Sequence, residues 1–419
     1  MVDSFVLNSG SVLILRHLSL ELFRGFEALE LPLGRRLTLL MGENGAGKTS
    51  VLDAMAVALG EIQSHLPQVK GRGFRKTGDI HQSAGKLAPY TRVGLTASDG
   101  LQWDRVRWRD KSRSTVNQLP LSTVGTRALR KHLDQTVLDP FNEGQPFVMP
   151  VFAYYGVGRA LLDVPLSRKG FEVDEQPFAA LSGALEADSR FRTAFAWFYA
   201  KENEELRLKN ESKDFELRLP ALECVRRAFQ AMFPDLRDPH VTLNPLRFMV
   251  SQGQEPLDIT QLSDGYQTLM GLVMDLSARM AMANPHLADP LTAEAIVMID
   301  EVDLHLHPAW QQRVVGDLLR TFPNAQFVLS THSPFVVESI NNLLKRHAIR
   351  NLPLADATIK ALLPLDPADV AAYVMSEGQA QSLMDAELGL LDDRLLAHFN
   401  RISAVYEQMR DLEWASNPS

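Results

Sequence analysis

The chain has 419 residues, of which 45% are hydrophobic and 22% charged, so it has room for one large or two medium globular domains. The formal net charge of −8 excludes an overall basic field, and any nucleic-acid contact needs a local basic patch or a partner. We find no apolar run of about 18 residues, as a membrane span needs, and no secretory leader. These features predict a cytoplasmic protein without membrane contact. The single cysteine, Cys224, excludes an internal disulfide and is expected to pack in the core.

Short strands joined by turns are predicted between residues 12 and 41, where apolar and polar residues alternate. The last strand, "LTLLM", runs into the glycine-rich sequence "GENGAGKTS" and then into a helix with apolar residues at helical spacing. Residues 61–92 are expected to form an extended loop. A hairpin around Asp99–Gly100 and a buried strand within "FVMPVFAYYGVGRALL" follow.

The second half of the chain opens with helical spacing and a charged middle over residues 180–234. This segment is too short for a long coiled coil and predicts a compact helical lobe. "AIVMID" and "QFVLSTHSP" are apolar strands typical of a parallel sheet that is covered on both faces. After them we expect only helical stretches, including an amphipathic one over residues 385–414. The expected units are residues 1–179 and 239–345 as two halves of one domain, 180–238 as an inserted helical lobe, and 346–419 as a C-terminal helical extension.

A phosphate-binding loop is indicated by the match of Gly42 to Thr49 to the pattern GxxxxGK[ST]. Backbone N–H groups of such a loop point at phosphate, Lys48 reaches the β and γ phosphates, and the Thr49 hydroxyl is a ligand of Mg²⁺. A chance glycine turn is disfavoured because the match lies between a predicted strand and a predicted helix. The nucleotide-binding residues expected here are Gly42, Asn44, Gly45, Ala46, Gly47, Lys48, Thr49 and Ser50.

Two acids follow the strand "AIVMI". Asp300 lies at its carboxyl end, where ligands bind in open α/β sheets, and is expected to hold Mg²⁺ with Thr49. Glu301 is the candidate base that orients the attacking water. Zinc binding by His305 and His307 is disfavoured, because their spacing matches no zinc motif and no cysteine accompanies them. We expect these histidines to shape the loop or to contact a facing subunit.

Further candidates come from three short sequences. His332, in "LSTHSP", follows the next strand and is expected to sense the γ-phosphate, with a structural strand-end histidine as the alternative. Ser263 and Gly265, in "LSDGYQ", provide a hydroxyl and backbone amides at a helix N-terminus, a second anion site. Gln82 is a candidate metal or water contact, or a plain loop residue.

In this order the motifs resemble the ABC-class ATPase head of SMC, RecF and OLD-type proteins. The sequences "FRGFE", "GENGAGKTSVLDA", "LSDGYQTLMGLVMDLSARM", "IDEVDLHLHPAWQ" and "FPNAQFVLSTHSP" are similar to bacterial predicted ATP-binding proteins involved in virulence. Relatives of that group include ATPase subunits of anti-phage systems such as Septu and PARIS. The motifs cover residues 12–60 and 255–340.

The resemblance implies an α/β fold: a P-loop NTPase with an ABC-type head, in which a mixed N-terminal β layer joins a parallel core sheet flanked by helices. It also implies ATP, Mg²⁺ and a homodimer through the nucleotide interface, or a higher oligomer built from it. Ser263 and Gly265 of one head would contact the γ-phosphate that Lys48 of the other holds. Asp264 and Tyr266 depart from the transporter signature LSGGQ, and the extra carboxylate is expected to slow closure or hydrolysis.

Two functions remain open from the sequence. In the first, the ATPase switches or scaffolds a separate effector, a nuclease or toxin, in a defence system, because the acids beyond His332 are scattered and no strand is predicted to present them as a nuclease centre. In the second, a RecF-like ATPase binds DNA directly through basic residues such as Arg72, Arg75 and Lys76, or through the stretch 104–113. Arg24, in "FRGF", would reach nucleotide or nucleic acid, or face solvent. A transporter motor is the weakest alternative, since no membrane-coupling feature is present.

Overall fold

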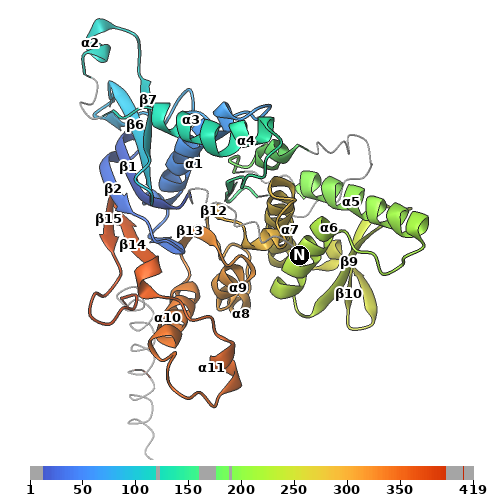
Figure 1. The fold of residues 1–419 in the computed structure, drawn as a ribbon. Helices are drawn as coiled ribbons and strands as arrows, with labels where there is room; N and C mark the ends of the chain where they lie inside the picture. The colour runs from blue at the N-terminus through green and yellow to red at the C-terminus, as the bar shows by residue number, and fades with distance from the viewer. Residues whose placement is uncertain (1–12, 119–122, 160–175, 188–190, 393–408, 410–419) are drawn as a thin grey trace, which may run out of the picture.

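The computed structural model describes residues 13–118, 123–159, 176–187, 191–392 and 409. Within these ranges a six-stranded sheet has the order β15-β14-β3-β13-β12-β8 (Figure 1). Neighbouring strands run parallel except for the pair β14 and β15. The strands are β3 (Leu37–Met41), β8 (Val151–Tyr155), β12 (Ala295–Ile299), β13 (Ala325–Thr331), β14 (Val370–Ser376) and β15 (Gln379–Ser382).

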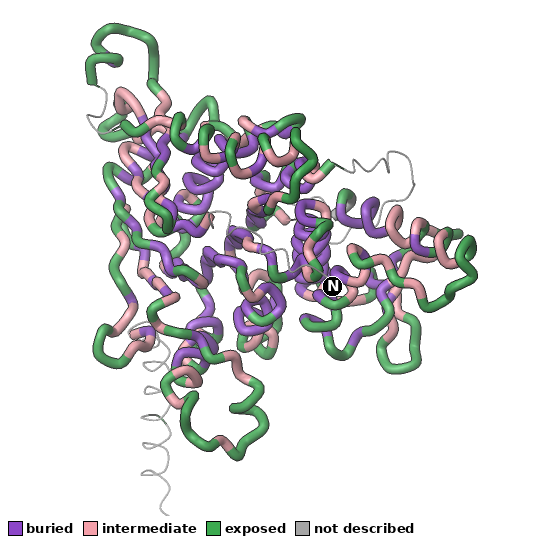
Figure 2. The backbone as a smooth tube through the Cα atoms, in the orientation of Figure 1, coloured by how far each residue is buried: buried purple, intermediate pink, exposed green. Residues whose placement is uncertain are grey.

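Burial explains why four strands of this sheet could be predicted from the sequence. Every residue of β3, β8, β12 and β13 is buried, as expected for parallel strands covered on both faces (Figure 2). Helix α1 (Lys48–His65) packs against β13 on one side and against an antiparallel sheet on the other. That second sheet has the order β2-β1-β6-β7. Its strands are β1 (Leu15–Phe23), β2 (Phe26–Pro32), β6 (Tyr90–Ala97) and β7 (Gln102–Trp108).

A lobe of helices and strands lies beside the central sheet (Figure 1). Its helices α5 (Phe191–Ser212) and α6 (Pro220–Met232) both pack on α7 (Asp264–Ala283), which also contacts β8. A three-stranded sheet of the order β11-β10-β9 completes it. These strands are β9 (Leu236–Thr242), β10 (Arg247–Gln252) and β11 (Glu255–Asp258). Cys224 is fully buried in α6, which confirms its predicted packing role.

Shorter elements connect these layers. Among the described helices, none is long and apolar enough to span a bilayer. The remaining elements are β4 (Gln82–Ser83), β5 (Lys86–Leu87), α2 (Arg113–Val116), α3 (Arg127–Leu133), α4 (Asp139–Asn142), α8 (Pro308–Gln311), α9 (Val314–Thr321), α10 (Pro334–Ala348) and α11 (Ala357–Ala361).

Two secondary-structure predictions were wrong. The expected loop over residues 61–92 begins only after His65, because α1 is longer than predicted, and it contains the hairpin of β4 and β5. The region after residue 345 is not only helical, because β14 pairs with β3 and extends the central sheet. Its alternation of buried and half-buried residues gives a weak hydrophobic signal. Most of the predicted amphipathic helix over residues 385–414 lies outside the described residues.

Candidate active site

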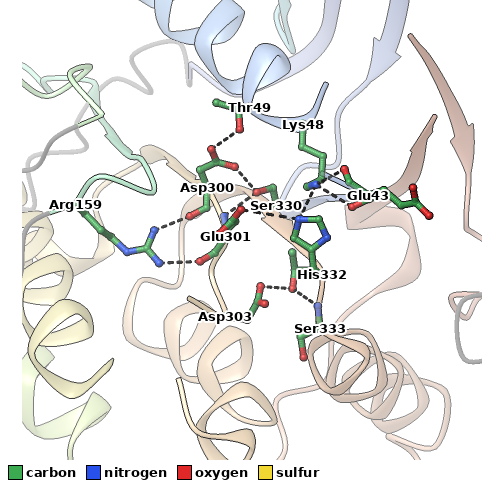
Figure 3. Close-up of polar contacts among 12 residues, drawn as sticks. Glu43, Lys48, Thr49, Arg159, Asp300, Glu301, Asp303, Ser330, His332 and Ser333 are labelled. Atoms are coloured by element: carbon green, nitrogen blue, oxygen red, sulfur yellow. Dashed lines mark hydrogen bonds and ion pairs between the residues drawn. The ribbon is translucent and has the colours of Figure 1, made fainter. Parts of the chain in front are cut away.

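The candidate residues meet at one edge of the central sheet. Strand β13 lies between β3 and β12 and runs parallel to both, so all three carboxyl ends reach the same edge. Lys48 follows β3, Asp300 follows β12 and His332 follows β13. Figure 3 shows the result: the Lys48 Nζ lies 2.9 Å from His332 Nε2, and the Thr49 hydroxyl donates to Asp300 at 2.6 Å.

The glycine-rich loop between β3 and α1 is open to solvent at its tip, where Asn44 and Gly45 are exposed. Gly47 has a φ of 102°, a region that L side chains rarely adopt. A Cβ at this position would lie 2.6 Å from Cζ of Phe26, so the antiparallel sheet also requires glycine there. The loop therefore keeps its backbone free of side chains where it turns into the helix, as phosphate contact requires.

Lys48 is a buried cation held by neutral groups. Its ammonium group donates to the carbonyl oxygens of Gly42 at 2.8 Å and Glu43 at 3.0 Å, and the residue is 6% exposed. Burial lowers the pKa of Lys48, and the nearby carboxylates of Asp300, Glu301 and Asp303 oppose that shift. A buried charge without a directly bonded counter-ion is costly. A phosphate group is the anion that this arrangement fits.

Hard oxygen donors surround Asp300. Its Oδ1 accepts from the Ser330 hydroxyl at 2.5 Å, and its Oδ2 accepts from Thr49. A hydroxyl and a carboxylate suit Mg²⁺, which binds through few protein ligands and substrate phosphates rather than in a protein cage. In the described part of the chain, no group of three or more His, Cys, Asp or Glu residues is arranged to hold a metal ion. His305 is exposed, and His307 caps α8 by accepting from the amide of Ala309.

Glu301 occupies a tight turn directly after Asp300. Its φ is 50°, a left-handed conformation that is unusual for a residue with a side chain. The Glu301 amide donates to the Ser330 hydroxyl at 2.7 Å, and its carboxylate lies 3.9 Å from His332 Nε2. The side chain is 31% exposed, so water can reach it. The predicted base thus borders both the solvent and the late histidine.

Arg159 belongs to this site and was missed in the sequence. It follows β8, and its guanidinium donates to the carbonyl oxygens of Asp300 and Glu301 (Figure 3). The available signal was its position: β8 is a buried strand that pairs with β12, so a polar residue just beyond it reaches the same edge. Strand β8 itself was predicted from the sequence, whereas its pairing with β12 was not.

The signature residues lie at the start of α7. Ser263 occupies the N-cap position but makes no capping hydrogen bond, and both Ser263 and Asp264 are exposed. Gly265 is buried, and a Cβ there would overlap the carbonyl oxygen of His305. No hydrogen bond or ion pair among the described residues joins Ser263 to the phosphate loop. The contact of Ser263 and Gly265 with another head stays a prediction.

Gln82 lies apart from the acids. It is exposed on the hairpin of β4 and β5 and lines a hollow together with Arg24, Lys76 and Arg107. Within the described chain, no hydrogen bond connects Gln82 with Thr49 or Asp300. Its role as a metal contact stays a prediction that the geometry does not favour.

Arg24 does not face solvent as a free turn residue but forms ion pairs. It pairs with Asp53 at 2.7 Å and Asp79 at 3.0 Å, two acids that are almost fully buried. Burial by itself would lower the pKa of Arg24, but these carboxylates raise it above the usual value. Arg72 also pairs with Asp53 and donates to the carbonyl of Leu185. These two arginines therefore hold the loop after α1 against the helix.

Comparisons with known proteins agree with this geometry. A family model described as "AAA domain" matches residues 17–230, and a second AAA domain model matches residues 168–338. The "Retron Vc95 probable ATPase" of Vibrio cholerae serotype O1 biovar El Tor is 26% identical over 393 residues, 81% of this chain and 74% of that protein.

The "Septu protein PtuA" of Bacillus mycoides (strain KBAB4) is 35% identical over 190 residues, 45% of this chain and 23% of that protein. A solved SmcHead bound to the C-winged helix domain of ScpA has a TM-score of 0.44 at 16% identity, covering 89% of this chain and 98% of that one. The predicted resemblance to P-loop ATPases is confirmed by the AAA domain models, together with ATPase activity, and the α/β fold is the one described above. The chain belongs to the AAA domain family.

Proposed function

We propose that this chain is a Mg²⁺-dependent ATPase that closes as a homodimer around ATP and thereby switches a separate effector protein in a bacterial anti-phage system. The observation that carries the ATPase part is the meeting of Lys48, Thr49, Asp300, Glu301 and His332 at one sheet edge. The defence context rests on the relatives, which are named as retron and Septu proteins and of which one matches 81% of the chain.

The catalytic roles follow from this placement. The phosphate loop and Lys48 bind the triphosphate, and Glu301 orients water for attack on the γ-phosphorus, with the bond to the bridging oxygen breaking in line. Mg²⁺, held by Thr49 and Asp300, would neutralise charge that develops on the phosphate oxygens. His332 accepts a hydrogen bond from Lys48 and lies between Lys48 and Glu301, where it would border the γ-phosphate.

Dimerisation is supported by the exposure of the second anion site. Ser263 lies at the exposed N-terminus of a 20-residue helix, and its hydroxyl makes no capping hydrogen bond. The helix dipole favours an anion at this end. No contact among the described residues joins this N-terminus to the phosphate loop of the same head, so a phosphate bound here would come from elsewhere. A facing copy of the chain would supply it, and closure would then depend on ATP held between the two heads.

The Glu301→Gln variant tests the proposal. It keeps the size and the backbone of Glu301 but removes the base, so we expect ATP hydrolysis to fall by at least about 100-fold. Bound ATP then persists, and light scattering after size exclusion should show a dimer in ATP and Mg²⁺. Lys48→Ala is the control: it should bind no ATP and stay in its nucleotide-free state. Wild-type hydrolysis by Glu301→Gln would remove Glu301 from its role.

Direct DNA binding is a second candidate function, favoured by the hollow that Arg24, Lys76 and Arg107 line. Around it, Arg24, Arg72 and Arg75 pair with Asp53 or Asp79, whereas no ion pair among the described residues joins Lys76 or Arg107 to an acid. The excess of positive charge is local, in a chain of net charge −8. Of the predicted DNA contacts, Arg72 is occupied by Asp53, whereas Lys76 is exposed and the Arg75 side chain is 60% exposed.

Charge reversal at Lys76 and Arg75 tests this candidate, because neither change removes a fully buried ion pair. If the hollow binds the phosphate backbone, Lys76→Glu with Arg75→Glu should abolish a salt-sensitive gel shift of short DNA. Lys360→Glu with Arg350→Glu, two exposed cations outside both predicted DNA-contact stretches, is the matched control and should shift DNA normally. No shift by the wild-type chain, together with a stable protein complex, would leave the effector switch as the function.

A further inference from the structure

Arg159 is half-buried, and its guanidinium contacts backbone carbonyl oxygens. Its Nη1 donates to the carbonyl oxygen of Asp300 at 2.6 Å and to that of Gly156 at 3.2 Å, and its Nη2 donates to the carbonyl oxygen of Glu301 at 2.7 Å. The guanidinium thus spans two consecutive peptide groups of the loop that carries both site acids (Figure 3). A planar fork with several fixed donors is suited to this task, whereas an ammonium group is not.

The position of the arginine is itself costly. Burial lowers the pKa of Arg159 to about 10, and the carboxylates of Asp300, Glu301 and Asp303 oppose the shift. No ion pair closer than 4.0 Å joins Arg159 to an acid among the described residues, so its donors are used on backbone carbonyls. A charge buried for this purpose fixes the backbone rather than neutralising a side chain.

The backbone that it fixes is the one that aims Glu301. The left-handed φ of 50° at Glu301 is unfavourable in an L residue and persists only when neighbours hold it. Ser330 holds the amide of this residue and Arg159 holds its carbonyl. Glu301 is thus held at both its amide and its carbonyl, and its carboxylate lies on the side of His332.

The far end of the same loop is fixed by the signature helix. Gly265 lies directly against the carbonyl of His305, and Arg159, Gly265 and Leu306 line one small cavity. The segment from Asp300 to Leu306 is therefore held by Arg159 at one end and by the start of α7 at the other. A change at either end alters the position of the acid between them.

We infer that Arg159 is a positioning residue for Glu301, acting through the backbone carbonyls of the acid pair, and this inference rests on the proposed ATPase function. A misplacement of about 1 Å can cost a catalytic group 100-fold in rate. ATP binding depends mainly on the phosphate loop and is largely independent of the hydrogen bonds from Arg159 to the carbonyl oxygens of Asp300 and Glu301.

Three variants test the inference: Arg159→Met, Arg159→Lys and, as control, Arg36→Met. Arg36 is also an arginine whose burial lowers its pKa and which donates to a backbone carbonyl, that of Leu319, but it precedes β3. We expect Arg159→Met to lower kcat by about 10- to 100-fold with the KM for ATP changed by less than about threefold. Arg159→Lys should recover part of kcat, and Arg36→Met should leave kcat unchanged.

A double variant distinguishes positioning from a general structural effect. Combined with Glu301→Gln, Arg159→Met should lower the residual single-turnover rate no further, because the group that it positions is gone. An equal loss in both backgrounds, or a wild-type kcat for Arg159→Met, would overturn the inference. If Glu301→Gln alone retains wild-type hydrolysis, the proposed function fails first, and that result is visible without any change at Arg159.

Discussion

At the scale of single residues, the contact between Lys48 and His332 joins two motifs that are 284 positions apart in the chain. Because the Lys48 ammonium group can only donate, His332 accepts at Nε2 and carries its proton on Nδ1 when it is neutral. The same nitrogen lies 3.9 Å from the Glu301 carboxylate. His332 therefore stands between the phosphate-binding cation and the candidate base.

Replacement of His332 by alanine should separate catalysis from binding. We expect kcat to fall by about 10- to 100-fold, because Lys48 and Glu301 lose the group that links them, while ATP affinity changes little. Steady-state hydrolysis and nucleotide titration measure the two effects. His307→Ala is a control on an exposed histidine of the neighbouring loop. Unchanged hydrolysis by His332→Ala would assign this residue to the strand-end alternative.

At the scale of elements, the sequence predicted what strong periodicity encodes. The strands β3, β8, β12 and β13 are buried throughout, and their apolar runs predicted all four as strands, with β12 and β13 assigned to a parallel sheet. The glycine loop, the acid pair and the late histidine each follow such a strand. Their meeting at one edge was therefore predictable from topology alone.

Elements with weaker patterns were lost. Strand β14 is only partly buried and contains two alanines, so it lacks the continuous apolar run of the fully buried strands. Its place beside β3 is a long-range pairing that local periodicity does not carry. Arg159 was missed for a related reason: its role depends on β8 pairing with β12. Gln82 was predicted from its residue type, but the hairpin of β4 and β5 that carries it makes no described hydrogen bond between Gln82 and Thr49 or Asp300.

At the scale of the whole molecule, an aromatic cluster connects the lobe to the site. The ring centroid of Phe233, at the end of α6, lies 6.2 Å from the ring centroid of Tyr266 and 5.5 Å from that of Trp310. Tyr266 belongs to the signature helix, and Trp310 follows the loop that begins with the acid pair. The three rings pack the lobe against both the signature helix and the loop that carries the acid pair.

The composite site of the proposed dimer gives a test on the whole molecule. Lys48→Ala removes the phosphate contact of one head. Ser263→Glu adds a carboxylate that repels phosphate, yet an acid at a helix N-terminus leaves α7 stable. Each variant alone should be inactive.

In an equal mixture, half of the dimers pair the two variants, and each of these contains one intact site, made of Lys48 from one head and Ser263 from the other. Hydrolysis should therefore recover to about a quarter of the wild-type rate. The control mixes the Ser263→Glu variant with a variant that carries both Lys48→Ala and Ser263→Glu. No head in this mixture has the natural serine, so it should stay inactive. If the first mixture is as inactive as the second, Ser263 does not act on the nucleotide of its neighbour, and the switch would have to work without a shared site.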